Sequence, residues 1–310
     1  MADVLPDSFG LSPVLITLRT CFITVLAIVI IVGNILSITV TCRVTYLADS
    51  TKVLMMALAA SDLLVGLLSL LFAVSSALDR WPFGTIGCTL VSHCIFIGLF
   101  ISIFSITGLN VDRYIAITRP YKFPVWCSKR RTVSFVDIVS ILAVSGSMIQ
   151  YIFGQHSKYY PAIAMCSFSY TSDASNILLV FVALAIPTLV ITPIYYRIIR
   201  ISRQHQLRDN PNNEGNNVRD NKALKVFLMV TLTFAICYSP NSLLRLVEGL
   251  ANWTSPDWLQ FIAEWLFIAN SAFNVFIYCL FNMAYRQMAK KVIQERILCC
   301  KHSAVGPVNI

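Results

Sequence analysis

Seven long apolar blocks constrain the fold of this 310-residue chain more than any other feature. A helix needs about 20 mostly apolar residues to cross the roughly 30 Å of hydrocarbon in a bilayer. Each block has about this length and at most one charged residue, whereas barrel strands would alternate polar and apolar positions. The pattern predicts an all-α membrane protein, a seven-transmembrane helix bundle. The blocks are Cys21–Val40, Val53–Leu78, Cys94–Val111, Thr132–Phe153, Ala174–Tyr196, Val226–Leu244 and Leu259–Leu280.

The composition excludes a water-soluble protein. Apolar residues make up 57% of the chain and charged residues only 13%. Soluble domains average about 45–50% apolar residues and about 25% charged residues. A globular core helix would explain any one apolar block, but it does not explain seven of them.

The positions of the basic residues predict the orientation in the membrane. Of the 24 Lys and Arg residues, only Arg19, Arg80, Lys158 and Arg245 fall on the side of the amino terminus, which leaves 20 on the other side. Cytosolic loops carry the excess of Lys and Arg, so we expect the amino terminus outside the plasma membrane and the carboxy terminus in the cytosol. The net charge of +9 then lies along one membrane face. It suits anionic lipids and an acidic cytosolic partner, not nucleic acid.

The same blocks divide the chain into three parts. We expect a short extracellular amino terminus over residues 1–20, a seven-transmembrane domain over 21–281, and an amphipathic helix with a cytosolic tail over 282–310. The first part lacks a charged n-region and a cleavage site, so no removable signal peptide is predicted.

Two pairs of cysteines have distinct predicted roles. Cys88 and Cys166 are the only cysteines in segments predicted to lie outside, where a disulfide is favoured over two free thiols. Cys299 and Cys300 are adjacent in the cytosolic segment and are candidates for palmitoylation, with unmodified thiols as the alternative. The four histidines do not occur at ligand spacing, so they do not predict a metal site.

Several polar side chains fall at mid-membrane depth, where they are costly. Asp62 is the only ionisable one in the second block. A carboxylate with hydroxyl and amide neighbours offers oxygen ligands to a small hydrated cation, or it forms a hydrogen-bonded knot between helices. The residues alone leave both alternatives open. The neighbours at similar depth are Asn34, Ser102, Asn270, Ser271 and Asn274.

The cytosolic end of the third block carries Asp112, Arg113 and Tyr114 in sequence. An arginine at this depth needs an acceptor. Asp112 is adjacent, and Asp220, just before the sixth block, is a second candidate. Pro240 interrupts the sixth block, where a kink or hinge is expected.

An ordered set of motifs resembles the rhodopsin-like (class A) G-protein-coupled receptors along nearly the whole chain. Any single motif is weak, but their order is specific. The motifs are Gly33-Asn34, Leu58-Ala59-Ala60-Ser61-Asp62, Trp81-Pro82-Phe83-Gly84 before Cys88, Asp112-Arg113-Tyr114 with Pro120, Pro187 with Tyr195, Phe234 with Cys237-Tyr238-Ser239-Pro240, and Asn274-Val275-Phe276-Ile277-Tyr278.

The resemblance implies roles for these residues. It implies that Asp62 helps to bind an allosteric sodium ion, with Ser102, Asn270, Ser271 and Asn274 as partners. It implies an inner switch of Pro187, Ile103 and Phe234. It also implies that Arg113 pairs with Asp112 and Asp220 at rest and moves toward Tyr195, Tyr278 and a heterotrimeric G protein on activation. After the seventh block, an apolar stripe predicts a short amphipathic eighth helix along the inner membrane surface. The stripe is Tyr285, Met288, Ala289, Val292 and Ile293.

Three departures from the family pattern stand out. The fourth block has no Trp, Tyr238 replaces the usual Trp of the sixth, and Val275 stands where the last motif normally has Pro. We expect a weaker kink beside Asn274 as a result.

The outer third of the bundle predicts a mostly apolar ligand pocket with a few polar groups, which suits a small molecule or a short peptide. In this resemblance, amine receptors carry an Asp at the position of Ile95, and opsins carry a Lys at the position of Ile268. An ordinary amine receptor and an opsin are therefore both disfavoured. Glu264 is either a counter-ion for a cationic ligand or the partner of Arg245. The predicted lining is Ile95, Phe96, Leu99, Phe100, Leu179, Ala183, Tyr238, Asn241, Ser242, Arg245, Gln260 and Glu264.

Together these features predict a G-protein-coupled receptor that carries a signal from an outside ligand to a heterotrimeric G protein. An ion-coupled transporter that uses the polar cluster around Asp62 is the alternative. No arrangement of side chains at membrane depth suggests an intramembrane enzyme or a bound cofactor.

Overall fold

The structure is a computed structural model. It describes residues 12–152, 156–168, 189–190, 192–194, 196–197, 214–251, 253–281 and 283–304. The elements are α1 (Pro13–Arg43), α2 (Asp49–Ala77), α3 (Gly84–Thr118), α4 (Phe123–Trp126), α5 (Lys129–Ile152), β1 (Ser157–Tyr160), β2 (Met165–Phe168), α7 (Glu214–Ala251), α8 (Asp257–Phe281) and α9 (Met283–Ala304).

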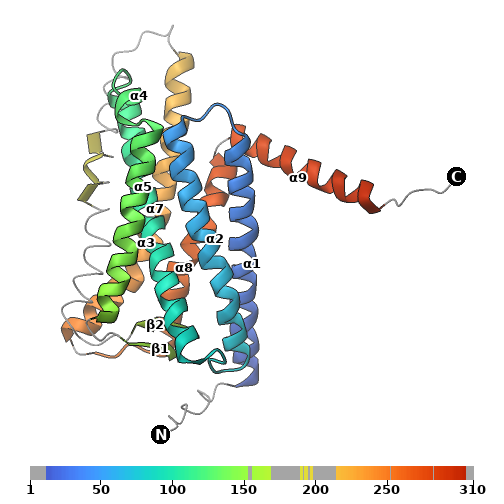
Figure 1. The fold of residues 1–310 in the computed structure, drawn as a ribbon, viewed down its shortest axis with the longest axis vertical. Helices are drawn as coiled ribbons and strands as arrows, with labels where there is room; N and C mark the ends of the chain where they lie inside the picture. Colours follow the sequence, from blue (N-terminus) through green and yellow to red (C-terminus); the bar gives the residue numbers. More distant parts are fainter. Residues whose placement is uncertain are drawn as a thin grey trace, which may run out of the picture.

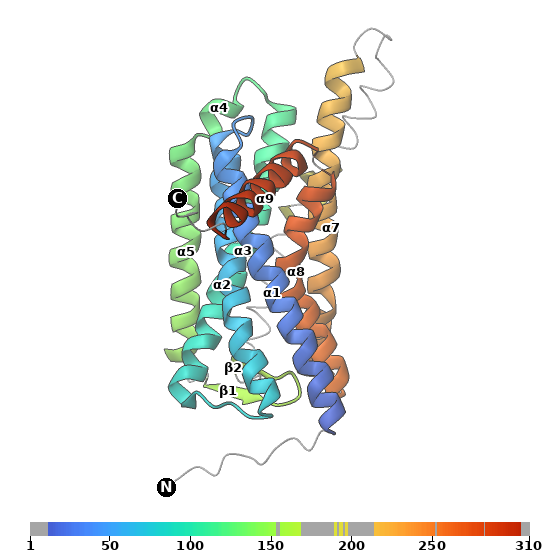
Figure 2. The ribbon, with the colours of Figure 1, turned by 90° about the vertical axis from the view of Figure 1, so that its right-hand side faces the viewer.

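The long helices α1, α2, α3, α5, α7 and α8 form one bundle (Figures 1 and 2). The β1–β2 hairpin lies at one end of the bundle, and α4 and α9 lie at the other. Five of the described helices, α1, α2, α3, α5 and α8, are long and apolar enough to cross a membrane. The predicted sixth span, Val226–Leu244, lies within α7. The predicted fifth span, Ala174–Tyr196, lies largely outside the described residues.

The first helix begins at Pro13, eight residues before the predicted span. The Ser12 side chain accepts a hydrogen bond from the backbone nitrogen of Leu15 and caps the helix, and Pro13 suits its first position. Hydropathy locates the membrane, whereas capping residues locate the helix ends. For this reason the helix extends beyond its apolar block.

The outward faces of the bundle are apolar. On α1, Val25, Ile28 and Val32 expose 61%, 50% and 60% of their surface. Such faces would be an aggregation hazard in water, and they are the expected surface of a helix in lipid. The inward faces form two buried clusters, an inner core toward α9 and an outer core toward the hairpin.

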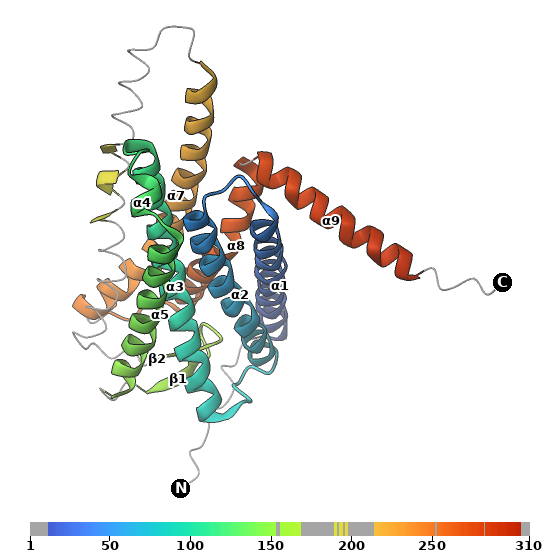
Figure 3. The same cartoon turned by 45° about the horizontal axis from the view of Figure 1, so that its top comes forward.

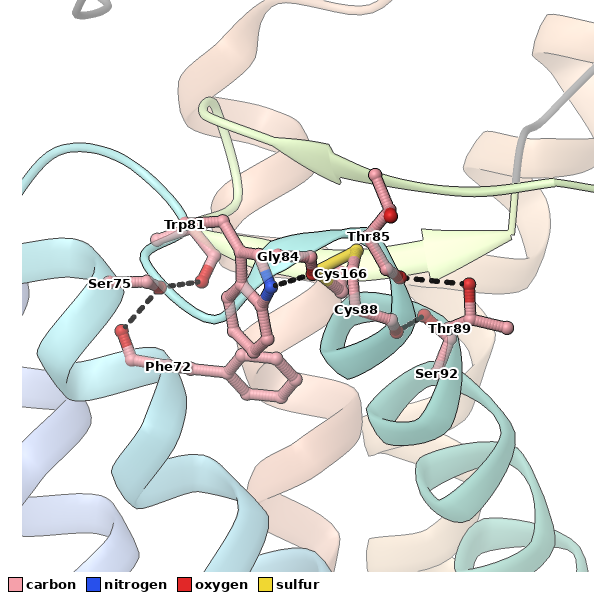
Figure 4. Close-up of a disulfide and its surroundings, with 10 residues drawn as sticks. Phe72, Ser75, Trp81, Gly84, Thr85, Cys88, Thr89, Ser92 and Cys166 are labelled. Carbon is pink, nitrogen blue, oxygen red and sulfur yellow. Dashed lines mark hydrogen bonds between the residues drawn. A yellow bond between two sulfur atoms is a disulfide. The ribbon is translucent and has the colours of Figure 1, made fainter. Parts of the chain in front are cut away.

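The hairpin pairs β1 and β2 antiparallel, from Ser157 opposite Phe168 to Tyr160 opposite Met165. A disulfide joins Cys166 of β2 to Cys88 of α3, with their Cα atoms 5.3 Å apart, so the predicted disulfide is confirmed. Figure 4 shows this bond between the hairpin and the outer end of α3, with the Trp81 indole nitrogen donating to the Gly84 carbonyl beside it.

The last helix, α9, leaves the bundle at a steep angle (Figure 3). Tyr285, Ala289 and Val292 from the predicted apolar stripe are buried, Met288 is half-buried, and Ile293 is 44% exposed. The helix runs for 22 residues and is longer than the short one predicted, because the first helix-breaking residue after Met283 is Gly306. Cys299 and Cys300 fall in α9, but their side chains lie outside the described set, so palmitoylation stays a prediction.

Candidate functional site

The polar residues predicted at mid-membrane depth meet around Asp62 of α2, which is fully buried. Ser271 and Asn274 of α8 donate to its two carboxylate oxygens over 2.8 and 2.9 Å. Ser102 of α3 lies beside the same carboxylate. Asn34 of α1 donates to the Ser271 carbonyl over 3.0 Å, so four helices meet at this cluster.

Within this group, the Ser102 hydroxyl has no hydrogen-bond partner among the described residues, and neither has the side chain of Asn270 of α8. Its side chain is 1% exposed, yet neither its amide nitrogen nor its amide oxygen has a hydrogen-bond partner within the described part of the chain. A buried amide without partners is costly, so it indicates a partner beyond the described residues. An amide oxygen, hydroxyls and one carboxylate are ligands that suit a small hydrated cation such as sodium.

At the end of α3 near α4, Asp112 is held by the start of α2. Ser50 and Thr51 donate to its two oxygens over 2.7 and 2.8 Å. Arg113 lies 3.4 Å from the same carboxylate and also donates to the Thr51 hydroxyl. The predicted pairing of Arg113 with Asp112 is therefore present. The side chains of Tyr195 and Asp220 lie outside the described residues.

The sequence reasoning missed Ser50 and Thr51. The signal that could have found them is a pair of hydroxyl residues in the first turn of α2, at the end of the bundle where Arg113 lies. Two switch residues predicted from the family, Phe234 and Tyr278, are buried in the inner core, at 4% and 3% exposure. Pro240 lies inside α7, as predicted, and Tyr114 is half-buried and bonded to Arg197.

Cys127, the residue that follows Trp126 at the end of α4, connects the segment between α3 and α5 to this arrangement. Burial, the charge of Asp112 and a hydrogen bond to Asp112 together raise the pKa of its thiol to about 11, with burial as the largest cause. The thiol is therefore neutral at physiological pH and donates toward Asp112. Asp112 thus receives donors from α2 and from the end of α4.

In the half of the bundle toward the hairpin, Arg245 and Glu264 of the predicted pocket join α7 to α8. Arg245 lies 3.0 Å from Glu248 and 3.5 Å from Glu264, measured between side-chain nitrogen and oxygen atoms. Glu248 also accepts from the backbone and the hydroxyl of Ser255. Gln260 donates to the Ser255 carbonyl over 2.9 Å. The ion pair of Glu264 with Arg245, one of the two predicted alternatives, is present.

The apolar residues of the predicted pocket separate into two groups. Ile95 and Leu99 are each 7% exposed and belong to the outer core. Phe96 and Phe100 are half-buried, with ring centroids 6.0 Å apart, and the Phe96 ring also packs against Phe168 of β2. The structure thus places the four α3 residues in two pairs, with Ile95 and Leu99 in the outer core and Phe96 beside Phe100 outside it.

At the inner boundary of the predicted pocket, the Tyr238 ring stacks on Phe234, with centroids 4.1 Å apart. Ser242 donates to the Tyr238 carbonyl, and Asn241 is half-buried beside it in the chain. The predicted lining residues Leu179 and Ala183 lie outside the described residues.

Comparisons with known proteins agree with this arrangement. A family model described as 7 transmembrane receptor (rhodopsin family) matches residues 33–278. The chain is 27% identical over 295 residues to a melatonin receptor type 1A-A of Danio rerio, covering 91% of this chain and 82% of that protein. It is 24% identical over 299 residues to trace amine-associated receptor 8b of Rattus norvegicus, covering 88% and 85%.

Among solved structures, the crystal structure of squid rhodopsin matches with a TM-score of 0.78 at 22% identity, over 94% of this chain and 88% of that one. This likeness supports the bundle fold. The sequence relatives are receptors, and the transporter alternative has no support. Because the family model spans most of its length, the chain belongs to the rhodopsin family of seven-transmembrane receptors, which signal through G proteins and are not enzymes.

Proposed function

We propose that this receptor detects a small extracellular molecule in its outer half and signals by releasing Arg113 from the contacts that hold it at the cytosolic end. The observation that carries this proposal is the set of bonds between α2 and α3. Asp112 and Thr51 both hold the Arg113 guanidinium, and Ser50 and Thr51 both hold Asp112. An arginine held in this way is not available to a cytosolic partner.

The mechanism is a shift between two conformations. A ligand activates the receptor only if it binds the conformation with Arg113 released more tightly than the one with Arg113 held. Moving an equilibrium from 1:99 to 99:1 requires about a 10⁴-fold difference in affinity. The released guanidinium would move toward Tyr278 and Tyr195 and face the G protein.

The ligand class follows from two supports. The relatives carry the names melatonin receptor and trace amine-associated receptor, and both names denote small molecules. The outer cluster of Arg245, Glu248 and Glu264 has two acidic groups and one basic group, so it carries one net negative charge that suits an amine or another hydrogen-bond donor. A short peptide is the competing ligand class, and a screen that includes both would separate them.

The switch is tested by two variants with opposite expected effects. Arg113→Ala should abolish nucleotide exchange on a co-reconstituted heterotrimer, because it removes the group that the G protein meets. Thr51→Val keeps the side-chain shape but loses the hydroxyl that holds Asp112 and Arg113. Basal nucleotide exchange should therefore rise several-fold, because the conformation with Arg113 held loses about 1 kcal/mol of stabilisation. Melatonin and a panel of primary amines serve as the first ligands in this assay.

The matched control is Arg130→Ala, which removes an exposed basic residue at the start of α5 and should leave exchange unchanged. Surface expression is measured for all variants. Full exchange in Arg113→Ala at normal expression would overturn the proposed switch.

We further propose that the cluster around Asp62 holds a hydrated sodium ion in the conformation with Arg113 held. The residues that would hold it are Asp62, Ser102, Asn270, Ser271 and Asn274. The partnerless amide of Asn270 supports this assignment. When bound, the ion would add positive charge between α2, α3 and α8 and favour their close packing.

Sodium binding predicts a stability difference between cations. Replacing potassium by sodium at about 150 mM and constant ionic strength should raise the melting temperature of the purified receptor by a few degrees, because a ligand stabilises the state that binds it. Asp62→Asn should remove this difference. Ser61→Ala, whose hydroxyl bonds to the Leu58 carbonyl, should retain it. An equal sodium effect in Asp62→Asn would refute the site.

A further inference from the structure

We refer to the turn between the two strands, residues 161–164, as the hairpin tip; its first two residues are half-buried and its last two are buried. Ile163 and Ala164 are completely buried, and Met165, which follows, is 1% exposed. These residues belong to the outer core together with Phe72 of α2 and Ile268 of α8. The hairpin tip is therefore part of the protein interior, although it lies in a loop between two spans.

Three carbonyl groups of the hairpin tip accept hydrogen bonds from three different helices. Arg19 of α1 donates to the Pro161 carbonyl over 3.0 Å, and Trp265 of α8 donates to the Ile163 carbonyl over 2.9 Å. Ser75 of α2 is 3.4 Å from the Ala164 carbonyl. Carbonyls that leave water need such partners, so these bonds fix the hairpin tip to α1, α2 and α8 at once.

Arg19 is the only charged donor among these three, and it is 7% exposed. Its guanidinium donates to the Ser76 hydroxyl over 2.9 Å and to the Asp79 carboxylate over 2.8 Å, both at the outer end of α2. Removing one member of a buried ion pair leaves the other charge uncompensated, so the arrangement depends on both. Through one side chain, α1, α2 and the hairpin tip are held together.

We propose that the hairpin tip is a fixed plug that fills the outer end of the bundle between α1, α2 and α8, and that Arg19 is the positioning residue that holds it there. The space on that side is thereby closed to ligands. In this proposal a ligand enters on the side toward α3 and α7, where Asn241 lies. This inference rests on the proposed function only in assuming that the outer half receives a ligand.

The plug is tested by the accessibility of cysteines to the water-soluble thiol reagent MTSET, with labelled sites identified by peptide mass spectrometry. Ser75→Cys is a near-isosteric reporter beneath the hairpin tip, and Asn241→Cys reports on the side toward α7. We expect slow labelling at position 75 and fast labelling at position 241. Adding Arg19→Met should speed labelling at position 75 by about tenfold or more, because the hairpin tip then opens locally.

The matched control is Arg80→Met, which removes an exposed arginine from the same end of the molecule and should leave both rates unchanged. If Arg19→Met does not yield folded receptor, Trp265→Phe replaces it, since it keeps an aromatic ring and loses the bond to Ile163. Fast labelling at position 75 with Arg19 intact, no acceleration when the bonds are removed, or equally slow labelling at position 241 would each overturn the plug.

This measurement needs neither a ligand nor a G protein. A negative result would therefore remove the plug while leaving the proposed function untouched. Conversely, full nucleotide exchange in Arg113→Ala would remove the proposed switch and leave the labelling result standing.

Discussion

The functional side chains in the middle of the bundle were easier to predict from the sequence than those at the end near α4. Asp62 and its partners were predictable because a carboxylate at mid-membrane depth must find polar neighbours, and few residues lie at that depth. Ser50 and Thr51 were not, because their role depends on the start of α2 lying against the end of α3, a contact between residues 62 and 61 positions apart. Likewise, periodicity alone did not separate the buried Ile95 from its half-buried neighbour Phe96.

Glu264 is the residue at which ligand chemistry can be tested. Arg245 lies nearer to Glu248, at 3.0 Å, than to Glu264, at 3.5 Å, so the Glu264 carboxylate is the more weakly held of the two. Glu264→Gln should therefore weaken the potency of a primary-amine agonist by about tenfold, or about 1.4 kcal/mol, with no change for a neutral agonist. The matched control is Asp257→Asn, which neutralises an exposed acidic residue at the start of α8 outside this cluster. Unchanged potency for the amine in Glu264→Gln would discard the counter-ion role.

At the scale of elements, hydropathy predicts the helices well and their ends poorly. Apolar blocks locate the hydrocarbon, but α1 begins where Ser12 caps it and α9 continues until glycine and proline are reached. The hairpin was not predicted, because two strands of four residues carry too little periodicity to stand out from a loop. Its disulfide was predictable because only two cysteines lie in the segments on that side.

Close packing of α1 against α2 depends on Gly66. A Cβ atom at this position would lie 2.7 Å from the Ile30 Cγ2 atom, inside contact distance. Gly66→Ala should therefore lower the free energy of unfolding by about 1–3 kcal/mol, despite the higher helix propensity of alanine. Gly146→Ala on α5 is the matched control, since its Cβ would meet Phe96 at an ordinary 3.7 Å. Thermal unfolding in detergent measures both, and equal melting temperatures would show that the helices separate without cost.

At the scale of the whole molecule, the two ends of the bundle have different chemistry. The hairpin and the buried ion pair of Arg19 and Asp79 occupy one end, and Arg113, α4 and α9 occupy the other. The exposed Arg286, Lys290 and Lys291 of α9 lie at that second end, where a cytosolic membrane surface would attract them. The family is one of multi-pass plasma-membrane receptors, which agrees with a bundle whose outward faces are apolar.

The orientation of this bundle in the membrane is the remaining prediction. Seven crossings place the two chain ends on opposite sides, and the excess of basic residues assigns the end with Arg113 to the cytosol. An epitope placed before residue 12 should therefore bind antibody on intact cells, whereas an epitope after residue 304 should bind only after permeabilisation, with signals that differ by about tenfold between the two conditions. Each epitope is tested in a separate protein, and the signal after permeabilisation controls for expression. Both epitopes reacting on the same side would require an even number of crossings, and then Arg113 and the hairpin could not serve a cytosolic partner and an outside ligand in one molecule.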